Sequence, residues 1–200
     1  EDSVVAKLDE PQFAEVATRH PKLYRVIAQE LSRHLLQRNR LVGAYREKVR
    51  VFVICSAEAL AIARCLQNAF AHDPFIITVW TDGVFRATHY TLESLEKAVD
   101  DSDFAIAIAH ADDLTASRGQ DWPAPRDNVV FELGLFMGRL GRQRAILMEP
   151  RLQKLKLPSD LAGLKTITYR FDVTADAASL LAPACNELRG HISTLGPNNG

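Results

Sequence analysis

From Val49 onward the chain alternates short apolar runs with amphipathic segments. The apolar runs are nearly continuous and rich in β-branched and aromatic residues, which is typical of strands buried on both faces of a parallel sheet. Segments with helical periodicity separate them, so the pattern predicts a sheet covered by helices on both faces. The predicted strands are 50–55, 75–80, 104–109, 144–148 and 165–171, and the predicted helices are 57–70, 91–100, 127–140 and 175–195.

Five such strands leave few topologies, because crossovers between parallel strands are right-handed. The flavodoxin-like strand order 2-1-3-4-5 is the natural one. We therefore predict an α/β fold with a doubly wound, five-stranded parallel sheet. Ligands of such sheets bind outside the carboxyl ends of the strands, at the switch point between the first and third strands. Two predicted loops, 81–91 and 111–126, start at that edge.

Residues 1–48 have a different pattern, with a strand end followed by two helices. Asp9 and Gln12 have the spacing of a capping box, which predicts a short helix from about Pro11. A second helix is predicted from Pro21 to about Glu47. These elements cannot enclose a core, so they belong to a truncated domain or to a connector that packs against a partner. The apolar residues behind this prediction are Val4, Val5 and Leu8, then Leu23, Ile27, Leu31 and Leu35.

Composition excludes several classes of protein. The 200 residues carry a net charge of -1, which gives no electrostatic basis for binding nucleic acid or a membrane surface. No apolar run is long enough to span a bilayer. The three cysteines are far apart and form neither a disulfide framework nor a zinc pair, so we expect reduced thiols and a cytoplasmic protein. The chain has no signal peptide and no initiator Met, which suggests a piece of something longer.

Glu132 is the most informative residue. It stands between apolar residues near the start of a predicted helix, just after the long loop that follows the third strand. A charge in such surroundings is either paired or functional. We therefore predict a nucleotide site at this edge, with Glu132 as its working residue. The candidate binding residues from the neighbouring loops are Ser56, Trp80, Phe85, Arg86, Arg126, Asp127 and Asn128.

Simpler roles remain open for these residues. An ion pair with Arg126 or Arg139 would account for Glu132 equally well. Asp127 and Asn128 are ordinary N-cap residues, and capping is the favoured interpretation for them. For the aromatic residues, Phe85 and Trp80, packing against the protein is the simpler role.

Three other patterns do not indicate a site. The glycines of residues 134–141 lie within and after a helix, whereas a phosphate-binding loop needs them before one. His110, Asp112 and Asp113 have no second cluster to complete a metal shell, so a solvated loop is expected there. The Gly-x-Ser-x-Gly motif of serine hydrolases is absent.

Several sequence blocks nevertheless match a known pattern: VFVICS at 51–56, DFAIAI at 103–108, Asp112-Asp113, RDNVVFELG at 126–134 and GRLGR at 138–142. With them, residues 49 to about 172 resemble the TIR-like domains of bacterial antiphage effectors. The resemblance implies a TIR fold and cleavage of NAD⁺ at the nicotinamide–ribose bond, with Glu132 as the catalytic glutamate. NAD⁺ would be the substrate, with no metal and no cofactor.

The N-terminal segment carries a second resemblance. PKLY at 21–24 and AQELSRHL at 28–35 resemble the terminal helices of a cyclic-nucleotide-binding domain. The chain would then consist of the end of that domain, 1–48, and a TIR-like domain, 49–196. This arrangement is similar to Pycsar TIR effectors, which respond to cyclic pyrimidine nucleotides such as cyclic UMP. The β-barrel and its phosphate cassette are absent, so the residues that bind the activator lie outside this sequence.

One carboxylate suits the implied reaction. Nicotinamide leaves as a neutral base and needs no general acid, unlike the leaving groups of ordinary glycosidases. Positive charge develops on the ribose, where a single anion stabilises it. Trp80 or Phe85 would stack on a ring of the dinucleotide, and Arg86 or Arg126 would meet its diphosphate.

The leading hypothesis is therefore an NAD⁺ glycohydrolase activated through self-association. The alternative is a non-enzymatic TIR scaffold, and a flavodoxin-like receiver is a third option. The receiver would need an acidic cluster after the first strand, where Ser56 stands instead.

Overall fold

The computed structural model describes residues 9–41, 47–81, 92–117, 119–161, 163–173 and 175–199. The chain divides into two compact units, one holding the first two helices and the other spanning Arg46–Asn198. The predicted strand end at residues 4–8 lies outside the described residues. No helix within the described ranges combines the length and apolarity needed to traverse a bilayer.

The first unit consists of helices α1 (Glu10–Arg19) and α2 (Lys22–Leu41). The predicted capping box is present at the start of α1. The Asp9 carboxylate accepts a hydrogen bond from the Gln12 amide at 2.9 Å, and the Gln12 side chain accepts one from the Asp9 amide at 3.1 Å. The prediction that the second helix reaches Glu47 is wrong, because Glu47 lies in a bend.

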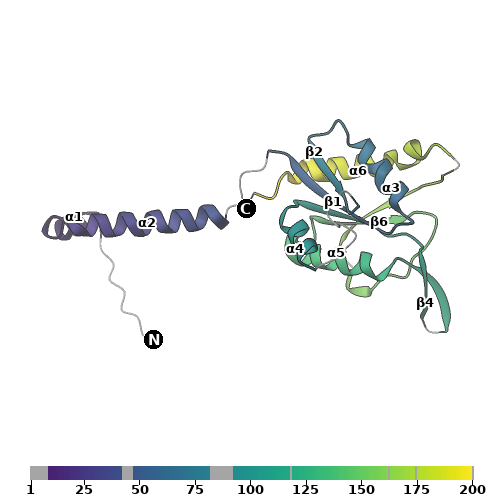
Figure 1. Cartoon of the computed structure of the whole chain (residues 1–200), viewed down its shortest axis with the longest axis horizontal. Helices are drawn as coiled ribbons and strands as arrows, with labels where there is room; N and C mark the ends of the chain where they lie inside the picture. Colours follow the sequence, from purple (N-terminus) through teal and green to yellow (C-terminus); the bar gives the residue numbers. More distant parts are fainter. Residues whose placement is uncertain are drawn as a thin grey trace. The chain divides into compact units, whose positions relative to one another are not determined.

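The second unit is built on a parallel sheet of five strands, β1 (Val49–Cys55), β2 (Phe75–Val79), β3 (Phe104–Ile108), β6 (Ala145–Pro150) and β7 (Lys165–Tyr169). The sheet, in which Figure 1 labels β1, β2 and β6, has the strand order β2-β1-β3-β6-β7. Counted along these five strands, this is the predicted order 2-1-3-4-5, so the predicted fold class is confirmed.

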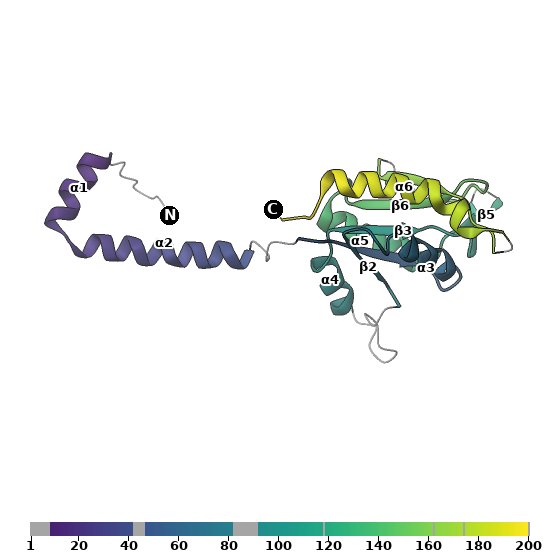
Figure 2. The ribbon, with the colours of Figure 1, turned by 90° about the horizontal axis from the view of Figure 1, so that it is seen from above.

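Helices cover both faces of the sheet (Figure 2). Alternate residues of the strands point to opposite faces and so build two cores. Val51 and Val53 pack with α3 (Leu60–Ala69) and α6 (Ala177–Leu195) on one face. Phe52 and Ile54 pack with α4 (Leu92–Asp100) and α5 (Asp127–Leu140) on the other. A short 3₁₀ helix, η1 (Ser159–Leu161), precedes β7.

The predicted loop 111–126 is largely a β-hairpin, which is a correction to the sequence analysis. Strands β4 (Asp113–Ser117) and β5 (Gln120–Ala124) pair antiparallel, and the hairpin projects beyond the sheet (Figure 1). Hydrophobic periodicity gave no signal because the hairpin is mostly exposed, with Leu114 at 74%. Gly119 has φ +76°, a conformation that suits glycine in a tight turn.

Candidate functional site

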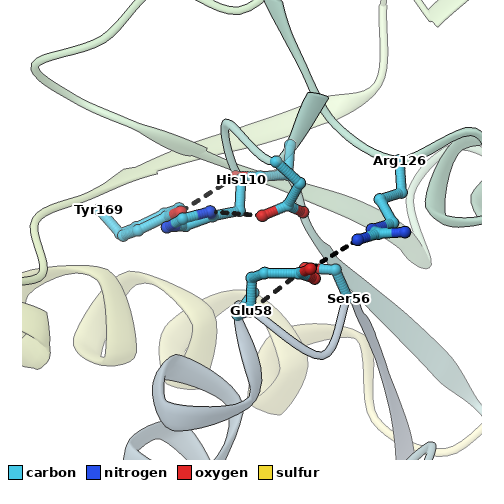
Figure 3. A network of polar contacts seen from close by, with 8 residues as sticks. Ser56, Glu58, His110, Arg126 and Tyr169 are labelled. Atoms are coloured by element: carbon cyan, nitrogen blue, oxygen red, sulfur yellow. Dashed lines mark hydrogen bonds and ion pairs between the residues drawn. The ribbon is translucent and has the colours of Figure 1, made fainter. Parts of the chain in front are cut away.

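The candidate site lies where β1, β3 and β7 end and α5 begins. Polar side chains from these four elements gather there (Figure 3). Ser56, directly after β1, is buried at 2% exposure, and its hydroxyl accepts a hydrogen bond from the Ala59 amide at 3.2 Å. This contact fixes the loop that leads into α3, so Ser56 has at least a structural role.

Arg126 and Glu58 form an ion pair across the site. The Arg126 guanidinium donates to Glu58 Oε1 at 2.5 Å, and both side chains are nearly half exposed. The pKa of Glu58 lies below its ordinary value because the carboxylate accepts a hydrogen bond from its own backbone and another from Arg126. The pair connects the loop after β1 to the start of α5.

Glu132 belongs to the buried face of α5. Only 4% of its surface is exposed, and Val129, Leu133 and Phe136 are buried on the same helix. Burying an ionised carboxylate is costly unless other groups compensate. The two arginines proposed from sequence as partners form ion pairs elsewhere: Arg126 with Glu58, and Arg139 with Asp100 at 2.9 Å.

The negative charge of Glu132 affects the thiol of Cys55. The pKa of Cys55 is raised to about 11, chiefly by burial. A hydrogen bond from Trp80 lowers this pKa, and the negative charges of Glu132 and Asp112 contribute to raising it. The Trp80 indole donates that bond to Cys55 Sγ at 3.1 Å. Both carboxylates therefore lie close enough to act on one thiol at the end of β1. Trp80 itself is half-buried and packs against both cores, as its simpler role requires.

The sequence analysis missed a contact between His110 and the buried side chain of Asp112. His110 Nδ1 and Asp112 Oδ1 are 2.7 Å apart, and the Asp112 side chain is only 1% exposed. Asp112 was expected in a solvated loop, and that expectation is wrong. Next to the pair, the Tyr169 hydroxyl donates to the Ala109 carbonyl at 3.0 Å and holds the ends of β3 and β7 together (Figure 3). The His-x-Asp spacing after a buried strand was the available signal.

A cavity of about 350 Å³ opens beside this pair. His110 and Tyr169 line it, together with Arg151, Arg170 and Phe171 from the segments that follow β6 and β7. A larger cavity of about 580 Å³ lies against α4 and the first half of β1, and none of the predicted site residues lines it. None of the predicted site residues lines the smaller cavity either, but it lies at the carboxyl ends of β3, β6 and β7.

The remaining predicted residues divide into two groups. Phe85 and Arg86 lie outside the described residues. Asp127 and Asn128 are exposed in the first turn of α5. The prediction that they cap the helix is wrong, because the N-cap residue is Arg126, in an extended conformation after Pro125, and its side chain makes no capping hydrogen bond. Within the described ranges, no group of three or more His, Cys, Asp or Glu residues could hold a metal ion.

Comparison with known proteins gives the family. Residues 50–170 match the family model described as CAP12/Pycsar effector protein, TIR domain. The chain belongs to this family. The resemblance to TIR-like effector domains predicted from the sequence is therefore confirmed.

Several curated relatives are similar over nearly the whole chain. Pycsar effector protein BcPycTIR of Burkholderia cepacia is 57% identical over 195 residues, which are 98% of this chain and 64% of that protein. Pycsar effector protein XpPycTIR of Xanthomonas perforans is 55% identical over 98% of this chain and 65% of that protein. CD-NTase-associated protein 12 of Lachnospiraceae bacterium (strain RUG226) is 38% identical over 61% of this chain and 38% of that protein. The chain thus spans just under two thirds of the length of its Pycsar relatives.

Proposed function

We propose that this TIR domain is an NAD⁺ glycohydrolase that acts as an antiphage effector in the cytoplasm. A cyclic pyrimidine nucleotide such as cyclic UMP would activate it by driving self-association, and the resulting loss of NAD⁺ would be the defence. The observation that carries the proposal is the burial of Glu132 at the carboxyl edge of the sheet, in a family whose relatives are named as effectors.

The chemistry needs a single well-placed anion. As the bond between nicotinamide and ribose breaks, its electron pair moves to the pyridinium nitrogen and leaves positive charge on the sugar. A carboxylate in a site of low polarity stabilises that charge more strongly than water would. Glu132 is a buried carboxylate on the face of α5 that also buries Val129, Leu133 and Phe136, which supports this role. Water then adds to the sugar and gives ADP-ribose and nicotinamide.

The first unit would couple the signal to the enzyme. Residues 1–48 would be the last strand and terminal helices of a cyclic-nucleotide-binding domain, with α2 as the connector to the TIR domain at 49–196. The names of the curated relatives, which identify Pycsar effectors, support this arrangement. The activating nucleotide would bind outside this sequence, and copies of the chain would associate with one another.

The test is release of nicotinamide from NAD⁺ by the full-length gene product, with and without each of a panel of cyclic mononucleotides. We expect activity only with an activator, and loss of at least about 100-fold in Glu132→Gln, because a buried electrostatic contribution of this kind is worth that much. Glu96→Gln is the matched control, since Glu96 is exposed on α4. Full activity of Glu132→Gln in the assembled state would refute the mechanism.

A non-enzymatic scaffold is the competing function. Exposed apolar side chains such as Phe131 at 59% and Leu114 at 74% offer surfaces for association. In that case Glu132 would serve the fold, and Glu132→Ala would lower the melting temperature substantially. An enzyme in which Glu132 is kept for catalysis predicts the reverse, with stability unchanged or raised when the buried charge is removed.

A further inference from the structure

Asp112 is a buried carboxylate with one open oxygen. Its side chain is 1% exposed, and Oδ1 contacts His110 at 2.7 Å. Among the residues that the structure describes, Oδ2 has no hydrogen-bond partner. A carboxylate can accept several hydrogen bonds, so half of the capacity of this group is unused.

An orphaned buried oxygen is costly to the fold. Leaving a buried acceptor unsatisfied forfeits its hydration, and a charged acceptor forfeits more than a neutral one. Such a group calls for an explanation, and a ligand that completes its hydrogen bonds would provide one.

The neighbours of Asp112 do not turn it into a structural ion pair. The cation at the entrance of the site, Arg126, donates at 2.5 Å to Glu58. His110 holds only one of the two carboxylate oxygens and itself lines the 350 Å³ cavity, so Asp112 contacts a residue of the cavity wall. His110 thus fixes the direction of the carboxylate and leaves the buried Oδ2 without a partner among the described residues.

The position of Asp112 favours a ribose as the ligand. It follows β3, at the carboxyl edge of a doubly wound sheet and at the switch point. In dinucleotide-binding sheets, an acidic residue at the carboxyl end of a strand accepts hydrogen bonds from ribose hydroxyls. The negative charges of Asp112 and Glu132 both raise the pKa of Cys55, the last residue of β1.

We propose that Asp112 Oδ2 accepts a hydrogen bond from a hydroxyl of the nicotinamide ribose, with His110 as the positioning residue that orients the carboxylate. The choice of NAD⁺ as the ligand rests on the proposed function. The new claim is that Asp112 is a second substrate-binding carboxylate beside Glu132. Asp113, its exposed neighbour, has no part in it.

The test pairs a protein change with a ligand change. Binding is measured by calorimetry in the activated full-length gene product with Glu132→Gln, so that turnover does not interfere. The ligands are NAD⁺ and its analogues that lack the 2′- or the 3′-hydroxyl of the nicotinamide ribose. Asp112→Asn should weaken binding of NAD⁺ by about 10- to 100-fold, the range for a hydrogen bond to a charged group.

Combining the change in the protein with the change in the ligand separates a direct contact from a structural effect of the substitution. Asp112→Asn should have little further effect on the analogue that lacks the contacted hydroxyl, and Asp113→Asn should affect no ligand. Equal losses for NAD⁺ and both analogues would overturn the proposal, as would an unchanged affinity for NAD⁺. The proposal would also be overturned if the effect of Asp112→Asn on affinity disappeared only with an analogue modified on the adenosine ribose.

Two further results keep the proposal open to refutation. If Asp112→Asn does not fold, a structure of the Glu132→Gln protein with NAD⁺ decides, and a ribose oxygen more than about 3.5 Å from Asp112 Oδ2 contradicts the contact. If the wild-type protein binds NAD⁺ with the expected dependence on Asp112 but never cleaves it, the proposed function fails and the ribose site stands. If NAD⁺ does not bind at all, both fail.

Discussion

The rings of Phe52 and Phe136 stack with their centroids 5.2 Å apart and their planes 13° from parallel. Phe52 lies in β1 and Phe136 is one turn after Glu132 in α5, and both rings are almost completely buried. The stack therefore fixes the helix that carries the candidate catalytic residue against the centre of the sheet. The packing of these two rings therefore contributes to the position of α5.

Phe136→Ala should be strongly destabilising. Removing a buried phenylalanine leaves a cavity and loses its apolar contacts, which costs about 3–5 kcal/mol. Urea unfolding of the variant should show a lower midpoint with an unchanged slope. Phe131→Ala is the control on the same helix, because Phe131 is 59% exposed and its loss should change stability by less than about 0.5 kcal/mol.

Asp103→Ala should also destabilise the TIR domain. The buried Asp103 carboxylate accepts hydrogen bonds from the Arg50 amide at 2.7 Å and the Asn198 amide at 3.0 Å. Truncation leaves a donor at the start of β1 without its acceptor, at a cost of about 1–3 kcal/mol. Asp101→Ala, two residues earlier and exposed, should be close to neutral in the same unfolding measurement. Equal stability of the two variants would contradict this account.

Alkaline pH should weaken the fold through its buried thiols. Burial raises the pKa of Cys55 and of Cys185 from the usual 9.0 to about 11. The unfolded chain then loses its thiol protons first, so stability that is complete below pH 9 declines as the pH approaches 11. Denaturant unfolding from pH 8 to 11 should show a smaller decline in Cys185→Ala than in the wild type. An identical pH dependence would count against this contribution.

Acid should cancel the contribution of the Glu58–Arg126 pair. The pKa of Glu58 is lowered in the folded protein, so the stability linked to it is present above the ordinary value of 4.5 and is lost as the pH falls through the folded value. The difference in melting temperature between wild type and Arg126→Gln should therefore be larger at pH 6 than at pH 3. It should also shrink in 1 M salt, because both side chains are well exposed.

The sequence predicted the sheet well because its strands are apolar on both faces. The stretch from Phe104 to Ile108 contains no polar residue that would interrupt the hydrophobic pattern, and all five residues are fully buried. The same logic failed for β4 and β5, where exposed polar residues alternate with few apolar ones. A hairpin of that kind is held by backbone pairing, which hydrophobic periodicity does not register.

The sequence indicated that Glu132 is buried, but not the contacts among the side chains of the candidate site. Burial of Glu132 follows from its apolar neighbours along α5, so one residue could be found from the pattern. The contact between Arg126 and Glu58 joins positions that are 68 residues apart, so no short-range sequence pattern predicts it. Asp112 looked like a solvated residue because burial of a single loop side chain depends on the elements that close over it.

The β4–β5 hairpin leaves β3 and returns to the sheet beside its own starting point, since Asp113 pairs with Ala124 and the Pro123 carbonyl accepts a hydrogen bond from the Lys156 amide at 2.7 Å. The tip of the hairpin therefore lies at the opposite end from its base, which α5 follows. A reporter group or a short peptide grafted at Gly119 would therefore lie on the outside of the molecule and could be used to test the proposed self-association without contacting the candidate site.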